Sequence, residues 1–327
     1  MTRASFLCRL LCLLVACMII EGLFAFVYRQ LPYEKAEDLR LIQRTEKMQD
    51  PTAYDLLILG DSTAMQGMNP RVIEQQTGFS AYNVATYRNI AAFTDPILLE
   101  RYLQHHPHPK AILVGRSITM WQQPQQLDTV WEYFFNANVL DAALPSFPFG
   151  LEAKLKIHLS VVSQVFRNWH SFRRRVTGKH QEQQVVTDTM RTIESHKGQR
   201  VSTGSSLSGV TSDVLRDDFY TFPVENTILL SYLCTQAVEN TIPLFMVTPP
   251  HAPADGYTKD TDPFPTAYDG YIERVLSFTD ARSAYCHYLR SPAFARPSEL
   301  SDGLHLNQTG SILYSAYLGR ALKELLR

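Results

Sequence analysis

The stretch "YDLLILGDSTAMQGMNP", residues 54–70, holds a short apolar run that ends abruptly in Gly60-Asp61-Ser62. A continuous apolar run of this length, closed by glycine, is typical of a strand buried in a parallel sheet. Ser62 follows the run by two residues, and open α/β sheets form their sites at the carboxyl ends of such strands. Ser62 is therefore either a nucleophile or one more polar turn residue, because turn residues also gather after strands.

Short apolar runs alternate with helical patterns along the rest of the chain. Besides the run at 54–60, the sequence predicts strands at 80–85, 110–115, 242–250 and 283–289. It predicts helices at 69–78, 88–104 and 224–241, and a last helix that begins at Asn307 as its N-cap. Alternation of this kind predicts an α/β fold, with a central parallel sheet and helices on both of its faces.

The composition is that of an ordinary globular protein with an apolar tendency. The chain has 327 residues, of which 45% are hydrophobic, and a core of that size needs neither disulfides nor a metal to hold it together. A net charge of -1 gives no reason to expect a nucleic-acid partner. We expect Cys234 and Cys286 to be free thiols, although a disulfide between them stays open in an oxidising compartment.

The N-terminus predicts a membrane anchor. Residues 6–28 are apolar except for Arg9 and Glu21, and their length is close to the roughly 20 residues that span a bilayer. Arg3 and Arg9 precede the apolar core, which favours an N-terminus that stays cytoplasmic. Because no A-x-A-like site is followed by a polar start of a mature chain, we predict an uncleaved signal-anchor helix over residues 1–29.

Two residues in this segment need an explanation. A carboxylate in hydrocarbon is costly, so Glu21 lies near the outer interface, pairs with a partner helix, or is protonated. "LVAC" at 14–17 resembles a bacterial lipobox that ends in Cys17. The chain stays hydrophobic after that cysteine, unlike most mature lipoproteins, so lipidation is the less favoured interpretation.

Beyond the anchor we predict three further parts. Residues 30–51 are charged and lack breakers between Pro32 and Asp50-Pro51, which indicates a helical stalk, and residues 52–327 form the globular domain. Within it, about 122–223 interrupts the alternation and is interpreted as an insertion of helices and loop over one edge of the sheet. Its basic run at 167–180 is either a solvated helix face or a contact for anionic lipid or glycan.

A serine hydroxyl needs a histidine to take its proton and usually a carboxylate to orient that histidine. Asp302 and His305 have two residues between them in "LSDGLHLNQTG", residues 300–310, directly before the last helix. A loop of this type presents both side chains toward one point. Each residue alone is explained as well by a turn or a helix cap, so the pairing of this loop with the distant Ser62 carries the hypothesis.

The two motifs together resemble the SGNH (GDSL-type) hydrolase superfamily, with G-D-S after the first strand and D-x-x-H before the C-terminal helix. The resemblance covers about 54–122 and 224–327. It implies a flavodoxin-like three-layer α/β/α fold, with Ser62 as nucleophile, His305 as general base and Asp302 as its orienting partner. The implied chemistry is acyl transfer through an acyl-serine, with no metal or organic cofactor.

The sequence departs from that superfamily where oxyanion donors are expected. The usual glycine after the second strand and asparagine after the third are replaced in "YNVATYRN" and "VGRSITMW". Besides the Ser62 backbone N–H, the candidate donors are Asn83, Thr86, Arg116 and Ser117. Arg116 is equally interpreted as the charge partner of a nearby carboxylate. His251, in "TPPHAP", either lines the cleft or lies in a plain exposed loop.

The chain also resembles a narrower group of proteins, and that resemblance is compatible with these departures. The anchor, the "MNP" after G-D-S, the "YN", the "PP" and "DGLHLN" are similar to membrane-anchored SGNH-like proteins of bacterial envelope acylation, the relatives of alginate O-acetylation proteins and of the D-alanyl transfer protein. The resemblance implies transfer or removal of an acyl group, acetyl by preference, on an envelope polysaccharide or related polymer. The implied partners are that polymer or an acyl donor and a multi-spanning membrane-bound acyltransferase. The implied location is the inner membrane, with the domain in the periplasm.

The alternative is a non-catalytic subunit with the same fold, which positions polymer or partner within an acylation or export complex. The presence of Ser62, Asp302 and His305 together favours the enzyme.

Overall fold

The computed structural model of the chain describes residues 3–31, 36–87, 90–117, 155, 158–160, 163–177, 188, 191–202, 224–253, 284–292 and 294–327. The strands of its sheet are β1 (Leu56–Gly60), β2 (Ala81–Asn83), β3 (Ala111–Gly115), β4 (Leu244–Val247) and β5 (Cys286–Tyr288). Each lies within a range that the sequence predicts, so the strand predictions are confirmed.

The strands form one parallel sheet in the order β2-β1-β3-β4-β5. This is the doubly wound order of flavodoxin-like folds, and the α/β class is thereby confirmed. The chain moves outward from β1 in one direction to β2 and in the other to β3. A crevice opens at such a switch point, beyond the carboxyl ends of the two strands. Ser62 follows β1 at this point and Arg116 follows β3.

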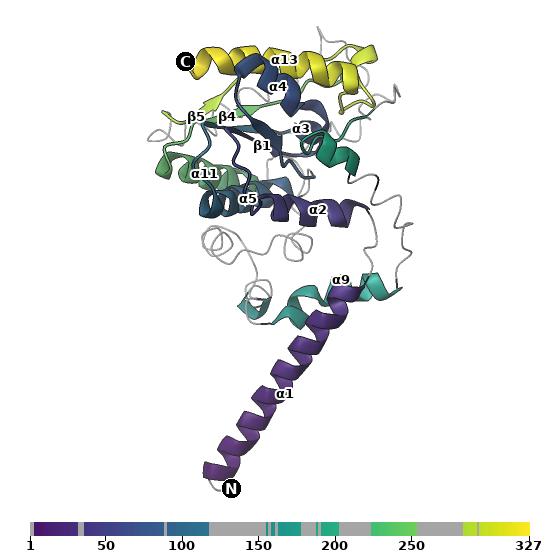
Figure 1. Ribbon diagram of the computed structural model, residues 1–327, viewed down its shortest axis with the longest axis vertical. Coiled ribbons are helices and arrows are strands. Elements are labelled where there is room, and N and C mark those ends of the chain that lie inside the picture. Colours follow the sequence, from purple (N-terminus) through teal and green to yellow (C-terminus); the bar gives the residue numbers. More distant parts are fainter. Residues whose placement is uncertain are drawn as a thin grey trace.

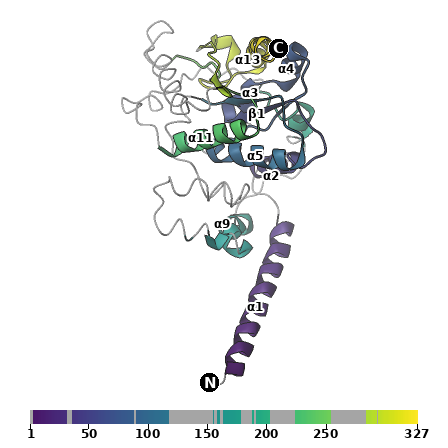
Figure 2. The ribbon, with the colours of Figure 1, turned by 90° about the vertical axis from the view of Figure 1, so that its left-hand side faces the viewer.

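Helices cover both faces of the sheet, which lies between them as a middle layer (Figures 1 and 2). The helices of one face are α3 (Ser62–Gly67), α4 (Pro70–Thr77) and α13 (Gln308–Leu325). Those of the other face are α2 (Ala36–Lys47), α5 (Ala91–His105) and α11 (Val224–Glu239). All but α2 and the short α3 were predicted as separate domain helices.

The apolar run of β1 explains the two layers of core. Leu57 and Leu59 belong to the cluster under α5 and α11, whereas Leu56 and Ile58 belong to the cluster under α13. Successive side chains of a strand point to opposite faces, so a strand buried on both faces must be apolar throughout. The prediction of free thiols is also confirmed, because Cys234 and Cys286 are both unbridged and buried.

The segment expected as a stalk lies against the domain. Its helix, α2, contributes Leu41 to the core cluster of the α5 face, and Met48 just beyond the helix is fully buried. The buried Arg44 guanidinium donates to the carbonyl oxygens of Asn83 and Gly198. A helix held by apolar and polar contacts of this kind is part of the domain's packing rather than a free spacer.

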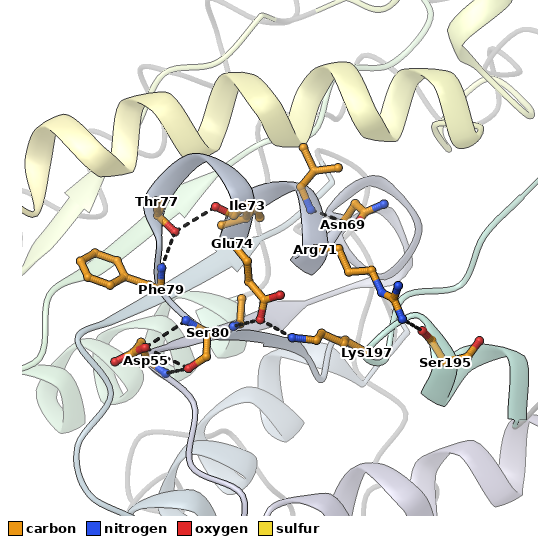
Figure 3. A network of polar contacts seen from close by, with 12 residues as sticks. Asp55, Asn69, Arg71, Ile73, Glu74, Thr77, Phe79, Ser80, Ser195 and Lys197 are labelled. Carbon is orange, nitrogen blue, oxygen red and sulfur yellow. Dashed lines mark hydrogen bonds and ion pairs between the residues drawn. The ribbon is translucent and has the colours of Figure 1, made fainter.

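Ser195 and Lys197 of the insertion contact α4 (Figure 3), and Lys197 also contacts β2, which is the edge strand of the described sheet. The Asn83 N–H donates to the carbonyl of Lys197 over 3.0 Å, and the Lys197 ammonium is paired with the Glu74 carboxylate of α4. An exposed edge invites pairing with other chains, so this segment caps part of the edge. Most of the insertion, with its predicted loop, lies outside the described residues.

The N-terminal helix α1 (Arg3–Gln30) projects away from the domain, and α9 (Gln164–Thr177) lies across its C-terminal end (Figures 1 and 2). By length and composition, Leu7–Gln30 is able to cross a membrane, with a mean hydropathy of 2.7 and no buried part in the apolar window. A signal sequence has the same properties.

Gly60 closes β1 in a conformation that only glycine adopts with ease. Its φ is 123°, and a Cβ atom there would lie 1.8 Å from the carbonyl oxygen of Gly115 at the end of β3. The next N–H, that of Asp61, donates to the same oxygen over 3.0 Å. Both the backbone angle and the close approach of the strands therefore exclude a side chain.

We predict that Gly60→Ala strongly destabilises the protein, because it adds a steric clash to about 1–3 kcal/mol of backbone strain. Gly78→Ala is the matched control, since Gly78 has a φ of 79° but nothing within 4 Å of its Cβ position. Thermal melts of both variants should show a much larger fall in Tm for Gly60→Ala. Equal losses would contradict the close approach.

Candidate active site

The backbone on both sides of Ser62 is tied down. Asp61 is the N-cap of α3, and its Oδ1 accepts from the N–H and the hydroxyl of Thr63 over 2.9 and 2.6 Å. Asp61 and Thr63 are buried, whereas Ser62 is half-buried. The serine therefore stands as the accessible residue of a fixed turn from strand to helix.

The structure brings Ser62 together with the distant loop that carries Asp302 and His305. The His305 Nε2 lies 2.9 Å from the Ser62 Oγ. The His305 Nδ1 lies 2.8 Å from Asp302 Oδ2 and 3.0 Å from Oδ1. A carboxylate only accepts, so Nδ1 carries the proton and Nε2 is left to accept the serine proton. The arrangement is that of a serine–histidine–carboxylate triad.

The loop that carries the histidine is folded back on itself. Leu300 and Leu306 form an antiparallel bridge, and the Ser301 N–H donates to the His305 carbonyl over 2.8 Å. Asn307 caps α13 with its side-chain oxygen and bonds the carbonyl of Leu300 with its amide nitrogen. The predicted N-cap is confirmed, and it holds the loop at the start of a long helix.

The charge on Asp302 is well stabilised. Partial burial by itself would raise the pKa of this carboxyl, but the hydrogen bond and positive charge of His305 and two backbone N–H groups outweigh it. The pKa falls to about 2. Asp302 is thus ionised wherever a histidine base works, and it orients the imidazole throughout that range.

Polar contacts that the sequence did not reveal hold α3 against α13. The buried Gln199, from the returning insertion, donates to the Gln66 carbonyl of α3 and to the Ser311 hydroxyl of α13. The Asn69 N–H donates to the Ser315 hydroxyl of α13 over 2.7 Å. These bonds fix the helix that starts at the serine relative to the helix that follows the histidine. Local sequence carries no signal for contacts between such distant segments.

The Asn83 side chain, a candidate oxyanion donor, is engaged in the interior. Its Nδ2 donates to the carbonyl oxygens of Ala64 and Met68 in and after α3, each over 2.9 Å. The Thr86 hydroxyl lies 2.7 Å from that of Thr94. Both candidates are buried, and an oxyanion role would require them to exchange these bonds.

Arg116 and Ser117, which follow β3, bind two buried carboxylates. Arg116 is fully buried, and its Nη2 lies 2.7 Å from an oxygen of the equally buried Asp95 of α5. The other Asp95 oxygen accepts from the Gly60 N–H over 2.9 Å. The Ser117 N–H and hydroxyl both donate to Asp61. The geometry therefore matches the charge-partner interpretation of Arg116.

Burial raises the pKa of Asp95, and the adjacent Arg116 guanidinium opposes that rise. Sequence reasoning singled out neither Asp61 nor Asp95. Asp95 lies among apolar residues of α5, 21 residues from its partner Arg116. No local motif therefore identified it as part of an ion pair.

His251 lies in the segment after β4 and is buried rather than in an exposed loop. Its Nδ1 is 2.6 Å from the carbonyl oxygen of Ala252, and its ring packs edge-on against Phe294. The Ala252 N–H donates to the carbonyl of Gly303, between Asp302 and His305. The segment thus supports the histidine loop, and a place for the His251 ring in the substrate cleft stays a prediction.

Comparisons with known proteins leave the family open. No family model matches the chain, and no curated protein matches it. Among solved structures, a proposed acylhydrolase from Bacteroides fragilis NCTC 9343 is similar with a TM-score of 0.39 and 11% identity, covering 88% of this chain and 97% of its own. A GDSL-like lipase from Bacteroides thetaiotaomicron VPI-5482 has a TM-score of 0.36 and 9% identity, covering 89% and 98%. Such weak similarity carries no argument, so fold and site rest on the chain's own strand order and contacts.

The lowered pKa of Asp302 predicts how stability depends on pH. The folded pKa of about 2 lies below the ordinary 3.8, so the ionised carboxylate stabilises the fold above pH 4 and loses this effect as the pH falls toward 2. The Tm advantage of the natural chain over Asp302→Asn should shrink between these values. Ser62→Ala should follow the natural chain, and a pH-independent difference would contradict the assignment.

Proposed function

We propose that the chain is a serine-dependent acyl-transfer enzyme, an acyltransferase or an ester hydrolase. One observation carries the proposal: the Ser62 Oγ lies 2.9 Å from His305 Nε2, while Asp302 holds the opposite ring nitrogen. A histidine in this position removes the hydroxyl proton as the oxygen attacks, which is the condition for a serine nucleophile at neutral pH.

The proposed reaction has two halves. In the first, His305 takes the Ser62 proton, the serine oxygen bonds to the acyl carbonyl carbon, and the leaving alcohol receives the proton from His305. In the second, His305 deprotonates an acceptor hydroxyl, which attacks the acyl-serine and releases Ser62. Water as acceptor gives hydrolysis, and a sugar hydroxyl gives transfer. The ionised Asp302 stabilises the imidazolium in both halves.

The oxyanion of each tetrahedral intermediate needs donors. We place it at the backbone N–H of Ser62, since the side chains of Asn83, Thr86, Arg116 and Ser117 are committed to interior partners. In this proposal these four residues position the strand ends and α3 around the serine and do not contact the substrate.

We further propose that α1 spans the inner membrane with its N-terminus in the cytoplasm and that the domain works in the periplasm. The apolar length of Leu7–Gln30 and the early arginines support this topology. The substrate we propose is an acyl ester, acetyl by preference, of an envelope polysaccharide or related polymer. A multi-spanning membrane-bound acyltransferase is the proposed partner, and the motifs shared with envelope-acylation proteins support this choice.

We predict that a fluorophosphonate labels the full-length protein in detergent and that Ser62→Ala abolishes the labelling. Hydrolysis of p-nitrophenyl acetate should fall at least about 10³-fold in Ser62→Ala and in His305→Ala. Ser195→Ala, at an exposed serine, is the matched control and should behave as the natural chain. Labelling that survives in Ser62→Ala refutes the nucleophile, and no labelling of any form favours the non-catalytic assembly subunit.

The topology predicts that alkaline phosphatase fused after Arg327 is active, because this reporter folds only outside the cytoplasm. The control fusion carries Arg3→Glu and Arg9→Glu, which remove the charge bias that orients the anchor. It should show lower reporter activity at equal amounts of protein. If alkaline phosphatase fused after Arg327 is inactive, and a reporter that works only in the cytoplasm is active at the same position, the periplasmic location is wrong.

A further inference from the structure

Three residues along one face of α1 contact α9. They are Glu21, Phe24 and Tyr28, spaced so that they lie above one another on the helix surface. The Phe24 ring lies 5.0 Å from that of Phe172, and the Arg175 guanidinium lies 4.4 Å above the Tyr28 ring. The last turns of the apolar helix therefore hold α9 through aromatic and cation–π contacts.

Glu21 is explained by the same contact. Its carboxylate accepts from the hydroxyl of Ser163 and from the N–H groups of Gln164 and Val165, the latter two over 2.8 and 3.2 Å. These N–H groups belong to the first turn of α9 and have no partner within that helix. A negative charge there also interacts favourably with the helix dipole. The one carboxylate in the apolar segment thus caps a helix.

The side of α9 next to the one that contacts α1 carries exposed apolar residues, and the Trp169 ring stacks on that of Phe172 at 5.7 Å. Phe166, Trp169 and Val176 expose 43%, 56% and 55% of their surface, and their spacing places them on one side of the helix. Leu155 and Leu159, just before α9, are also exposed. Arg173 lies between Trp169 and Val176 on the same side. Solvated helices do not usually expose large apolar side chains around a central tryptophan in this way, so we expect another surface to cover this side of α9.

The charge of α9 indicates what kind of surface this side contacts. The helix contains four arginines and no acidic residue. Arg173 is exposed, and Arg175 lies over Tyr28 of the anchor. A helix with an apolar stripe, an interfacial tryptophan and only positive charge has the composition of one that lies in the surface of an anionic bilayer.

The height of α9 along α1 agrees with that position. At 1.5 Å per residue, the 28 residues of α1 measure about 42 Å, whereas hydrocarbon spans about 30 Å. Counted from Arg3 or from Arg9, a span of about 20 residues ends near residue 23 or near residue 29. The far boundary of the hydrocarbon therefore lies around Phe24 and Tyr28. These are the residues that hold α9, and α9 lies across the end of α1 rather than along it (Figures 1 and 2).

We propose that α9 is an interfacial helix that docks the protein on the anionic phospholipid surface of the leaflet nearest the domain. The proposal rests on the membrane span of α1 and is independent of the serine chemistry. The bilayer is favoured over a protein partner because α1 brings it to α9 without any further component. The docked helix would hold the domain at the membrane surface.

The test uses Trp169 as a depth probe in the full-length chain. The chain has three tryptophans, so Trp121→Phe with Trp131→Phe leaves Trp169 as the only emitter. The protein is reconstituted in vesicles of phosphatidylglycerol with phosphatidylcholine, or of phosphatidylcholine alone, with brominated lipids as quenchers. We expect Trp169 to lie about 5–10 Å into the interface of the anionic vesicles, with blue-shifted emission and protection from iodide.

Two charge reversals form a matched pair. Arg173→Glu on α9 should shift the balance between surface-bound and solvent-exposed helix about fivefold or more toward solvent, since each basic residue strengthens surface binding by about that factor. Arg320→Glu makes the same change at an exposed site of α13, at the far end of the domain. It should leave the quenching of Trp169 unchanged.

Flotation after a carbonate wash reports the insertion of α1 separately. A chain that floats while iodide still quenches Trp169 overturns the docking alone, whereas a chain that does not float overturns the membrane anchor as well. Equal protection of Trp169 from iodide in vesicles of phosphatidylcholine alone would show that docking does not depend on anionic lipid. Protection that occurs only in native membranes, and not in pure lipid, assigns the α9 face to a protein partner instead.

Discussion

The close approach of β1 and β3 at Gly60 and Gly115 is the constraint on which the site depends. It lets the Asp61 N–H reach the Gly115 carbonyl, so the turn that carries Ser62 starts from a fixed point. The buried Asp95–Arg116 ion pair fixes the same end of β1, because Asp95 also accepts a hydrogen bond from the Gly60 N–H. Breaking such a pair leaves an uncompensated buried charge, which typically costs about 3–5 kcal/mol. The interior is thus organised around the end of one strand.

Around this point the chain assembles a site from segments that are far apart in sequence. The serine comes from the first βα turn, and the histidine comes from the last loop before α13. Their relative position is set by buried polar contacts between α3 and α13, including Gln199 from the returning insertion. A reaction between neighbouring side chains tolerates little displacement, and these contacts hold the triad in place. The insertion therefore supports the two helices that carry the site.

The apolar helix and the domain are linked in a similar way, by a polar group that finds its partner in another segment. Glu21 would be costly in hydrocarbon, yet it caps α9, and α9 in turn exposes Arg173 and two aromatic side chains, Phe166 and Trp169. A single acidic residue thus joins an apolar span to a basic amphipathic helix.

The sequence by itself determined the strands, most helices and the three residues Ser62, Asp302 and His305, because periodicity, caps and motifs are local properties of a chain. The tertiary structure alone decided the partners of Arg116 and Glu21, and it brought α2 into the core. A charged or amide side chain binds whichever complementary group the fold brings near it, and spacing along the chain does not encode that choice. The same reason explains why Asn83 and Arg116 were open as oxyanion donors from sequence, while their contacts lie in the interior.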